Sequence, residues 1–221
     1  MLDTMTRMPL SPTERSTIRR DAQRARTDRS ELDALLDAAL VCHLSVIADG
    51  APLVLPTTYG RDGDTLYLHG SAEAQSLRLA AAGAVCVAVT LLDGVVYART
   101  PKDFSLNYRS AVIHGRPSEV VDADAKLHGL RTIVEHCAPG SWDYVPHPTA
   151  HDLSWTTVLA LDLTEASVKV RSGGPHDSPA DIAAGGIWAG QLPLRTTWGT
   201  PIPSPDLVGD VAVPDHITRR R

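Results

Sequence analysis

Three Asp-Gly pairs, each lying between apolar stretches with strand-like alternation, constrain the fold of this chain most strongly. They are Asp49-Gly50, Asp62-Gly63 and Asp93-Gly94. Asp-Gly suits the tight turns between antiparallel strands, because both residues tolerate positive φ angles. A parallel sheet would instead need a helix between most strands. The sequence therefore predicts a mainly β fold of antiparallel hairpins with flanking helices, most simply a β-barrel.

Hydrophobic periodicity places the individual elements. The expected strands span residues 40–47, 51–60, 67–71, 84–92, 95–100, 110–121 and 155–170. The strands ending at Gly60 and Ser71 are expected to be neighbours, joined by the turn at 61–64. The expected helices are 29–39, with Asp28 as its N-cap, 72–82, with Ser71 as its N-cap, and 123–137. Residues 138–154 are expected to form a loop.

The length of 221 residues indicates one structural domain. Its composition divides it into a polar N-terminal arm (1–27), a β domain (28–171) and a Gly/Pro-rich C-terminal tail (172–221). The tail lacks the periodicity of a segment that builds its own core. We expect it to cover the barrel or to cross to a partner subunit.

Composition also excludes several classes of partner. The net charge of −5 gives no general basic field for nucleic acid. No run of about 18 apolar residues suggests a membrane span, and the N-terminus lacks a signal-peptide pattern. The three cysteines lie within apolar patterns without C-x-x-C spacing, so we expect no metal site and a reducing, cytoplasmic environment.

A possible phosphate cradle lies where the strand 67–71 meets the helix 72–82. A helix N-terminus offers free N–H groups and a positive dipole end, both suited to a phosphate. Ser71 lies at this junction, and Arg78 and Arg109 could supply cationic side chains. A guanidinium group binds a phosphate dianion through two parallel hydrogen bonds.

These segments together resemble the flavin-binding split-barrel family related to pyridoxamine 5′-phosphate oxidase, in particular its flavin-nucleotide-binding and nitroimidazole-reductase-like branch. The resemblance covers roughly residues 15–207. The segments that carry it are Thr13-Glu-Arg, Leu40-Val-Cys-His-Leu-Ser45, Leu66-Tyr-Leu-His-Gly-Ser71, Asn107-Tyr-Arg-Ser110, Ala166-Ser-Val-Lys-Val-Arg171 and Ile187-Trp-Ala-Gly-Gln-Leu-Pro-Leu-Arg195. The family implies a split β-barrel homodimer that holds two FMN molecules at its interface.

The resemblance also implies a set of cofactor-binding residues. In the family, the strand matching Thr57, Thr58 and Tyr59 lines the flavin ring. The remaining candidates lie at the expected phosphate cradle, at the start of the expected strand 110–121 and in the tail: His69, Gly70, Ser71, Ser76, Leu77, Arg78, Asn107, Tyr108, Arg109, Ser110 and Trp188. The basic pair that the oxidases proper carry beside the cradle is replaced here by Gln75-Ser76-Leu77-Arg78.

The implied activity is flavin-dependent oxidation or reduction of a small molecule, with a nicotinamide cofactor or oxygen as the second reactant. The oxidase reaction itself is not expected, because Thr196 and Thr197 follow Arg195 where those enzymes carry Arg-x-His. No catalytic residue is assigned. The alternatives are a deazaflavin or haem cofactor, a binding module without turnover, and a nitro-group reductase. Nine histidines make haem worth testing, although no spacing identifies an axial ligand.

Overall fold

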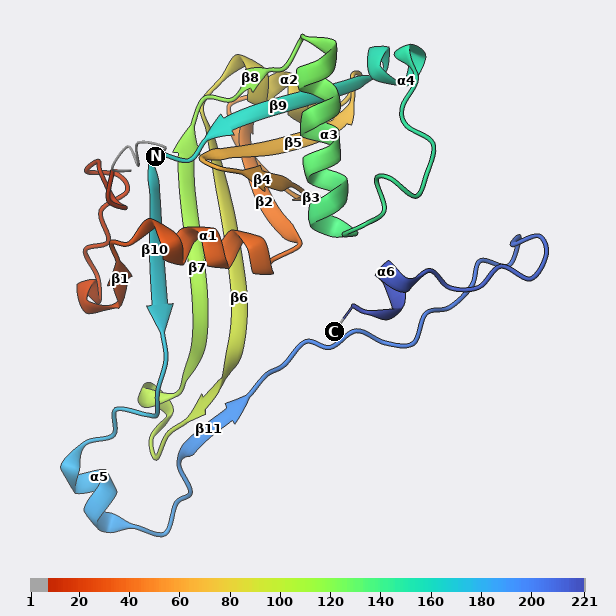
Figure 1. The fold of residues 1–221 in the computed structure, drawn as a ribbon. Coiled ribbons are helices and arrows are strands. Elements are labelled where there is room, and N and C mark those ends of the chain that lie inside the picture. Colours follow the sequence, from red (N-terminus) through yellow and green to blue (C-terminus); the bar gives the residue numbers. More distant parts are fainter. Residues whose placement is uncertain (1–7, 221) are drawn as a thin grey trace, which may run out of the picture.

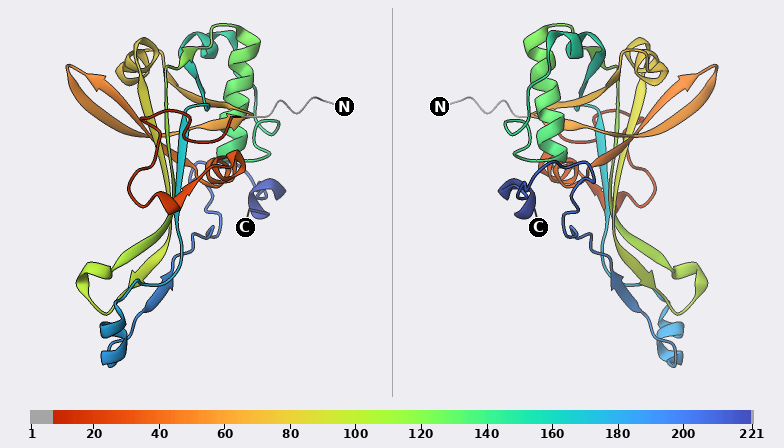
Figure 2. Two further views of the ribbon diagram at one scale, coloured as in Figure 1. Left: turned by 90° about the vertical axis from the view of Figure 1, so that its left-hand side faces the viewer. Right: turned by 90° about the vertical axis from the view of Figure 1, so that its right-hand side faces the viewer.

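The computed structural model describes residues 8–220, in which antiparallel strands form two sheets (Figures 1 and 2). The larger sheet has seven strands in the order β1-β10-β7-β6-β2-β3, and β11 also pairs with β6. The smaller sheet has four strands in the order β4-β5-β9-β8. This pairing confirms the predicted mainly β architecture with flanking helices. Within the described residues the two sheets are not joined into a closed barrel.

The strands are β1 (Ala25–Arg26), β2 (Val41–Ala48), β3 (Ala51–Thr58), β4 (Gly60–Asp62), β5 (Thr65–Ser71), β6 (Val85–Tyr97), β7 (Ser105–Gly115), β8 (Ser118–Glu119), β9 (Thr156–Asp162), β10 (Ala166–Arg171) and β11 (Gly190–Pro193). The helices are α1 (Arg29–Ala38), α2 (Gln75–Ala82), α3 (Ala123–Cys137), α4 (Ala150–Ser154), α5 (Pro179–Ala184) and α6 (Asp215–Thr218), with short 3-10 turns at Ala22–Arg24 and Pro101–Asp103.

The main core lies between the two sheets and α1. Strand side chains alternate between faces, so every second residue of β2, β6 and β5 points inward. Leu44, Val87 and Leu66 are buried representatives of these three strands. Helix α1 crosses the larger sheet and adds Leu32 and Leu36 to the same core (Figure 1). The expected helix 29–39 is thus confirmed to within one residue, and the Asp28 side chain caps it by accepting from the Ser30 N–H.

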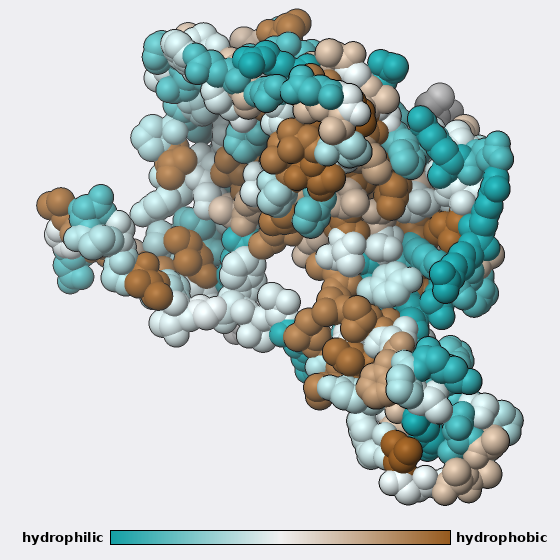
Figure 3. Space-filling view, turned by 180° about the vertical axis from the view of Figure 1, so that it is seen from behind, coloured by the Kyte–Doolittle hydropathy of each residue, from teal (hydrophilic) through white to brown (hydrophobic). Residues whose placement is uncertain are grey.

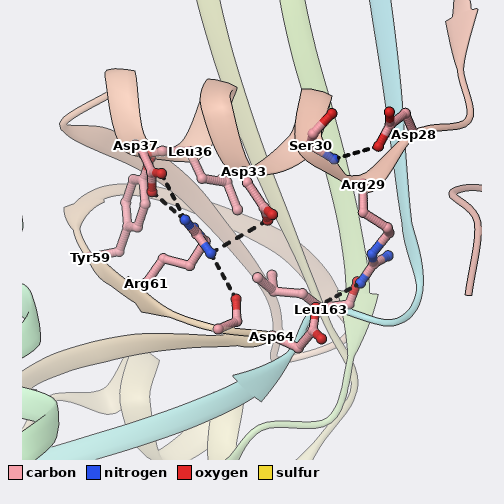
Figure 4. Close-up of polar contacts among 11 residues, drawn as sticks. Asp28, Arg29, Ser30, Asp33, Leu36, Asp37, Tyr59, Arg61, Asp64 and Leu163 are labelled. Carbon is pink, nitrogen blue, oxygen red and sulfur yellow. Dashed lines mark hydrogen bonds and ion pairs between the residues drawn. The ribbon is translucent and has the colours of Figure 1, made fainter. Parts of the chain in front are cut away.

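Two arginines fix α1 to β4 and to the connection between β9 and β10 (Figure 4). Arg61 binds Asp37 through Nε and Nη2, at 2.9 and 2.7 Å, and also approaches Asp33 at 3.4 Å. Arg29 is buried and donates to the carbonyl oxygen of Leu163 at 2.7 Å. These contacts bind the first helix to the smaller sheet and to the connection that leaves it, so we regard them as part of the scaffold.

Helix α3 covers the outer face of the smaller sheet and has the predicted bounds. Its close approach depends on two glycines. A Cβ at Gly60 would lie 2.6 Å from the backbone of Thr132 and Ile133, and one at Gly129 would lie 2.9 Å from Val158. Leu130, Trp142 and Val158 form a second, smaller core beneath the helix.

The expected hairpin at Asp93-Gly94 is wrong. Strand β6 continues through this pair to Tyr97, and the pairing with β7 shifts between Leu92 and Gly94, as in a β-bulge. Gly94 is required because β11 lies against it: a Cβ there would approach the Leu192 carbonyl oxygen to 2.7 Å. The chain instead reverses after Tyr97, around the short helical turn at Pro101–Asp103.

The expected pairing of the strand ending at Gly60 with the strand ending at Ser71 is also wrong for most of its length. Strand β3 pairs with β2, and only the short β4 pairs with β5. The chain changes sheets at Tyr59, whose side chain is completely buried. Its hydroxyl lies 2.6 Å from the Leu36 carbonyl oxygen and 2.8 Å from that of Ala39, where α1 ends.

Three other element boundaries differ from expectation. The expected strand 110–121 begins earlier, at Ser105, and is interrupted after Gly115. The expected strand 155–170 is two strands in different sheets, β9 and β10. The expected loop 138–154 contains α4. This helix begins at a capping box formed by Thr149 and Asp152. Alternation of apolar residues identified these regions as β structure, but it does not show where a chain passes from one sheet to another.

The two terminal segments both contact the β domain. Residues 1–7 of the predicted arm and Arg221 of the predicted tail lie outside the described residues. In the arm, Thr13 and Arg15 both bind the carboxylate of Glu165. The tail adds β11 to β6 and then stands away from the strands with an opening between them (Figure 3). It returns to the loop that follows α3, where His216 lies against Tyr144.

Candidate functional site

The predicted cofactor residues lie at three places in the chain. The first is the end of β3, with Thr57 and Thr58. The second is the junction of β5 and α2, and the third is the middle of β7 together with Trp188 before β11. Within residues 8–220 no hydrogen bond, ion pair or ring contact joins these places. Helix α2 and β11 lie at opposite ends of the fold (Figure 1), so a single chain does not gather the set into one site.

The junction of β5 and α2 differs from its prediction in detail. Helix α2 begins at Gln75 after the N-cap Ala74, which provides no side-chain cap, so Ser71 is not the N-cap. The Ser71 hydroxyl instead accepts from the Glu73 N–H at 3.2 Å, because three residues of turn separate strand from helix. The first N–H groups of α2 therefore remain free of side-chain acceptors, as an anion site requires.

Three further residues of this junction have distinct roles. Leu77 is buried and packs against Gly70, where a Cβ would lie 2.8 Å from the Leu77 side chain. Ser76 is half-buried and Arg78 is exposed on the helix. The Arg78 guanidinium has no hydrogen bond or ion pair with any described residue. Leu77 and Gly70 thus shape the junction, whereas Ser76 and Arg78 are open to a ligand.

His69 carries the least satisfied polar atom of the predicted site. Its ring is half-buried, and its Nδ1 is buried without a hydrogen-bond partner among the described residues. Burial lowers the pKa of His69 below its ordinary value, so the ring is neutral near pH 7. Alternation along β5 places it on the same face as Tyr67, beside its cross-strand partner Val158. This is the sheet face that α3 covers.

The residues at the end of β3 differ in exposure. Thr58 is exposed and Thr57 half-buried, so their backbone can be reached by a ligand. The buried Tyr59 side chain serves the core. Its hydroxyl satisfies carbonyl groups at the end of α1, and burial raises its pKa.

The β7 group lies in the interior of its strand, contrary to the expectation that it opens one. Arg109 forms two hydrogen bonds with Asp93, and this pairing raises its pKa. Tyr108 is half-buried, and the Ser110 hydroxyl donates to the Lys169 carbonyl oxygen at 3.4 Å. Trp188 is 68% exposed, with its ring 5.8 Å from that of Tyr97.

Three polar residues beside this group have no predicted role: Asp93, Arg171 and Gln191. The sequence places Asp93 in a turn, and Arg171 only ends a family-like segment. The available signal was an arginine closing an apolar strand just before Ser172-Gly173-Gly174. Its burial and its partner Asn107 depend on strand pairing across the sheet, which spacing alone does not reveal.

Among residues 8–220 there is no helix long and apolar enough to span a membrane. The same residues contain no cluster of three or more histidine, cysteine or acidic side chains suited to a metal ion.

The chain is similar over nearly its whole length to two proteins of known structure. It shares 35% identity with the flavocytochrome Anf3 from Azotobacter vinelandii, with a TM-score of 0.91, covering 96% of this chain and 99% of that one. It shares 37% identity with the FAD and haem binding protein from Mycobacterium smegmatis, with a TM-score of 0.84, covering 88% and 96%.

A more distant likeness supports the fold alone. A putative 5-nitroimidazole antibiotic resistance protein from Bacteroides thetaiotaomicron is 22% identical, with a TM-score of 0.53, over 66% of this chain and 86% of that one. No curated protein matches the sequence significantly. The family model described as pyridoxamine 5′-phosphate oxidase matches residues 28–170, which span α1 to β10. The chain therefore belongs to the pyridoxamine 5′-phosphate oxidase-like family of flavin-binding split barrels.

Proposed function

We propose that this protein is a flavin-nucleotide-dependent redox protein acting on a small molecule. The main support for this proposal is the similarity of the chain, including its tail, to a flavocytochrome and to a protein that binds FAD and haem. The family resemblance in the sequence favours FMN, and the name of the second relative makes FAD the alternative. A nicotinamide cofactor or oxygen would be the second reactant. A binding module without turnover remains the alternative from another class.

The residues of this chain fit a flavin nucleotide at the junction of β5 and α2. The free N–H groups of α2, the Ser76 hydroxyl and the unpaired Arg78 guanidinium would bind its phosphate. The exposed backbone at Thr58 and the Trp188 ring would contact and shield the ring system. The bound flavin supplies the electron-transfer chemistry, and the protein binds, orients and shields it.

Haem is the second cofactor that the two relatives suggest, and His69 is the histidine that best fits it. A histidine binds haem iron through an unprotonated ring nitrogen, so a histidine ligand must be neutral. Burial keeps His69 neutral and leaves its Nδ1 without an acceptor. Two other histidines already have partners: His128 contacts Asp62 at 2.9 Å, and His136 contacts the Ala39 carbonyl oxygen at 2.7 Å. We propose His69 as a candidate ligand for haem because its buried Nδ1 lacks a partner among the described residues.

We further propose a homodimer in which each cofactor site takes residues from both subunits. Two observations support it. The three groups of predicted site residues lie apart in one chain, and a two-fold axis would allow the β7 group of one subunit to complete the junction site of the other. The tail also exposes large apolar side chains, including Ile202 at 92% and Val208 at 89%. Such residues indicate a covered surface.

Cofactor release tests the proposal directly. Full-length protein would be reconstituted with excess FMN, FAD and haemin, desalted and heated, and the released compounds identified by chromatography. We expect a flavin nucleotide at a stoichiometry near one per chain. Haem that is bound by the parent but lost in His69→Ala, with flavin retained, would support the haem assignment. Failure to retain either flavin would contradict the proposed function. A cytoplasmic location rests on the sequence alone and stays a prediction.

A further inference from the structure

The last part of the tail, residues 198–220, closes on itself, and we call it the distal loop. The Arg220 guanidinium joins the two ends of this loop, because its Cζ lies 4.0 Å from the centroid of the Trp198 ring. His216 fixes the loop to its own subunit. It packs against Gly140, where a Cβ would lie 2.8 Å from the His216 Cβ, and its ring lies 5.1 Å from that of Tyr144. The loop is thus held at its base, although none of its residues is buried.

The distal loop exposes a continuous set of large apolar side chains. Ile202 is 92% exposed and Val208 is 89% exposed. The loop also encloses an open hollow of about 450 Å³, whose larger apolar lining residues are Tyr144, Ile202, Leu207, Val211, Val213 and Ile217. Apolar side chains gathered in this way mark a surface that another protein covers.

A solved structure shares the course of the tail. Residues 172–221 make up 50 of the 221 residues of the chain. The flavocytochrome from Azotobacter vinelandii matches 96% of this chain with a TM-score of 0.91, so the match includes most of the tail. Ordering a segment that stands away from its own domain (Figure 3) costs conformational entropy, which contacts with another surface must offset.

The hairpin of β2 and β3 carries a second apolar surface. This hairpin stands out from the body of the molecule (Figure 2). Val41, Ile47 and Val54 share its outer face by strand alternation and are between 45% and 58% exposed. Leu44, on the opposite face of β2, is buried in the core. Within residues 8–220 no hydrogen bond, ion pair or ring contact joins the distal loop to this hairpin, so both apolar surfaces of a single chain stay uncovered.

We propose that the distal loop is a clasp for a second copy of this chain, and that it seats on the outer face of the β2–β3 hairpin of that copy. A two-fold arrangement covers both surfaces at once, because each subunit offers its loop and receives the loop of its partner. A different protein bound to the loop would leave the hairpin face of each subunit exposed. The inference rests on the proposed homodimer and names the surfaces that hold it together.

Aspartate substitutions in the full-length protein test the two surfaces separately. Ile202→Asp alters the loop, and Val54→Asp alters the hairpin. Each should raise the dissociation constant of the dimer by about tenfold or more, because an apolar contact is lost and a carboxylate faces an apolar surface. Val121→Asp is the matched control, because Val121 is 81% exposed and lies before α3, outside both surfaces. Sedimentation velocity with and without added flavin measures assembly independently of cofactor binding.

Mixing the two variants shows which surfaces meet. A dimer of either variant alone has both of its loop–hairpin contacts altered. A mixed dimer keeps one unaltered contact, between the loop of the Val54→Asp subunit and the hairpin of the Ile202→Asp subunit. We expect the mixture to associate more strongly than either variant alone, a gain that unfolded protein cannot produce.

Three results would overturn the proposal: a parent protein that stays monomeric at micromolar concentration, unchanged association of the Ile202→Asp and Val54→Asp variants, or no gain on mixing. The last result is the one expected if the loop folds onto the hairpin of its own subunit or if two loops contact each other. Each of these results is independent of whether the protein binds flavin, so it leaves the proposed redox function to the cofactor-release experiment.

Discussion

Arg109 binds the carboxylate of Asp93 through two parallel hydrogen bonds, Nε to Oδ2 at 3.0 Å and Nη2 to Oδ1 at 2.8 Å. The sequence predicted Arg109 as a phosphate ligand, and the structure shows that an internal anion already occupies its fork. The residue can bind a cofactor phosphate only by exchanging partners. The bulge at Leu92–Gly94 creates this competition, because it places Asp93 beside Arg109 instead of in a turn.

The exchange of partners predicts a modest effect on flavin affinity. Arg109→Ala should weaken FMN binding by about tenfold, the lower end of the effect expected for a hydrogen bond to a charged group. The effect is modest because Arg109 gives up its bonds to Asp93 when it binds the phosphate. Riboflavin, which lacks the phosphate, should bind the parent and the variant equally. Fluorescence titration measures both. Identical FMN affinity in the two proteins would remove Arg109 from the cofactor site.

Tyr59→Phe should destabilise the fold without altering the cofactor site. The change leaves the buried carbonyl at Leu36 without its hydroxyl donor, whereas Ala39 keeps its contact with His136. We expect a loss of about 1–3 kcal/mol in the free energy of unfolding, measured in urea. Flavin affinity should not change. A large loss of flavin affinity at unchanged stability would mean that Tyr59 belongs to the site after all.

His69 predicts a pH dependence of stability. Its folded pKa lies below the unfolded value of about 6.5, so the unfolded state binds more protons in the window beneath that value. The contribution of His69 to the free energy of unfolding is fully present above about pH 6.5, and it is lost as pH falls toward the folded pKa. His69→Asn should therefore flatten the stability profile between about pH 7 and 5. Parallel profiles for the parent and the variant would contradict the assignment.

Local sequence signals predicted those parts of the fold that depend on neighbouring residues. Helix α3 was predicted with its bounds, since the apolar spacing that predicted it is a local feature. Helix α1 was predicted to within one residue for the same reason. The predicted hairpin at Asp93-Gly94 is wrong, because this dipeptide also suits a β-bulge, and here β11 pairs with β6 beside it. The transfer of the chain between sheets at Tyr59 has no local signal, because a strand on either sheet shows the same alternation.

The candidate site was predicted less well than the fold. The segments at His69–Ser71 and Asn107–Ser110 do carry polar groups suited to a cofactor, but the structure places them apart. Arg171 gained no role because its significance comes from its burial beside Asn107 on the directly paired strand β7, a contact that residue spacing does not show. Residues that act through contacts across a sheet leave little trace in spacing.

Removal of the tail should affect cofactor and assembly together. Deletion from Ile187 onward removes Trp188, β11 and the exposed apolar side chains that follow. We expect weaker flavin binding and a shift from dimer to monomer in the same variant, because a ligand that contacts both chains stabilises only the assembled form. Gel filtration and flavin titration of this protein measure the two effects. Loss of flavin affinity without loss of the dimer, or loss of the dimer without loss of flavin affinity, would show that the tail does not contribute to a shared site.

The central claim, a flavin site shared between two subunits, is tested most directly by sedimentation velocity of the reconstituted full-length protein. Detection at the visible absorption band of the flavin follows the cofactor, and detection in the ultraviolet follows the protein. A shared site predicts that the flavin sediments with the dimer at micromolar concentration and that dilution releases flavin as monomer forms. A monomer that retains its full complement of flavin would contradict it.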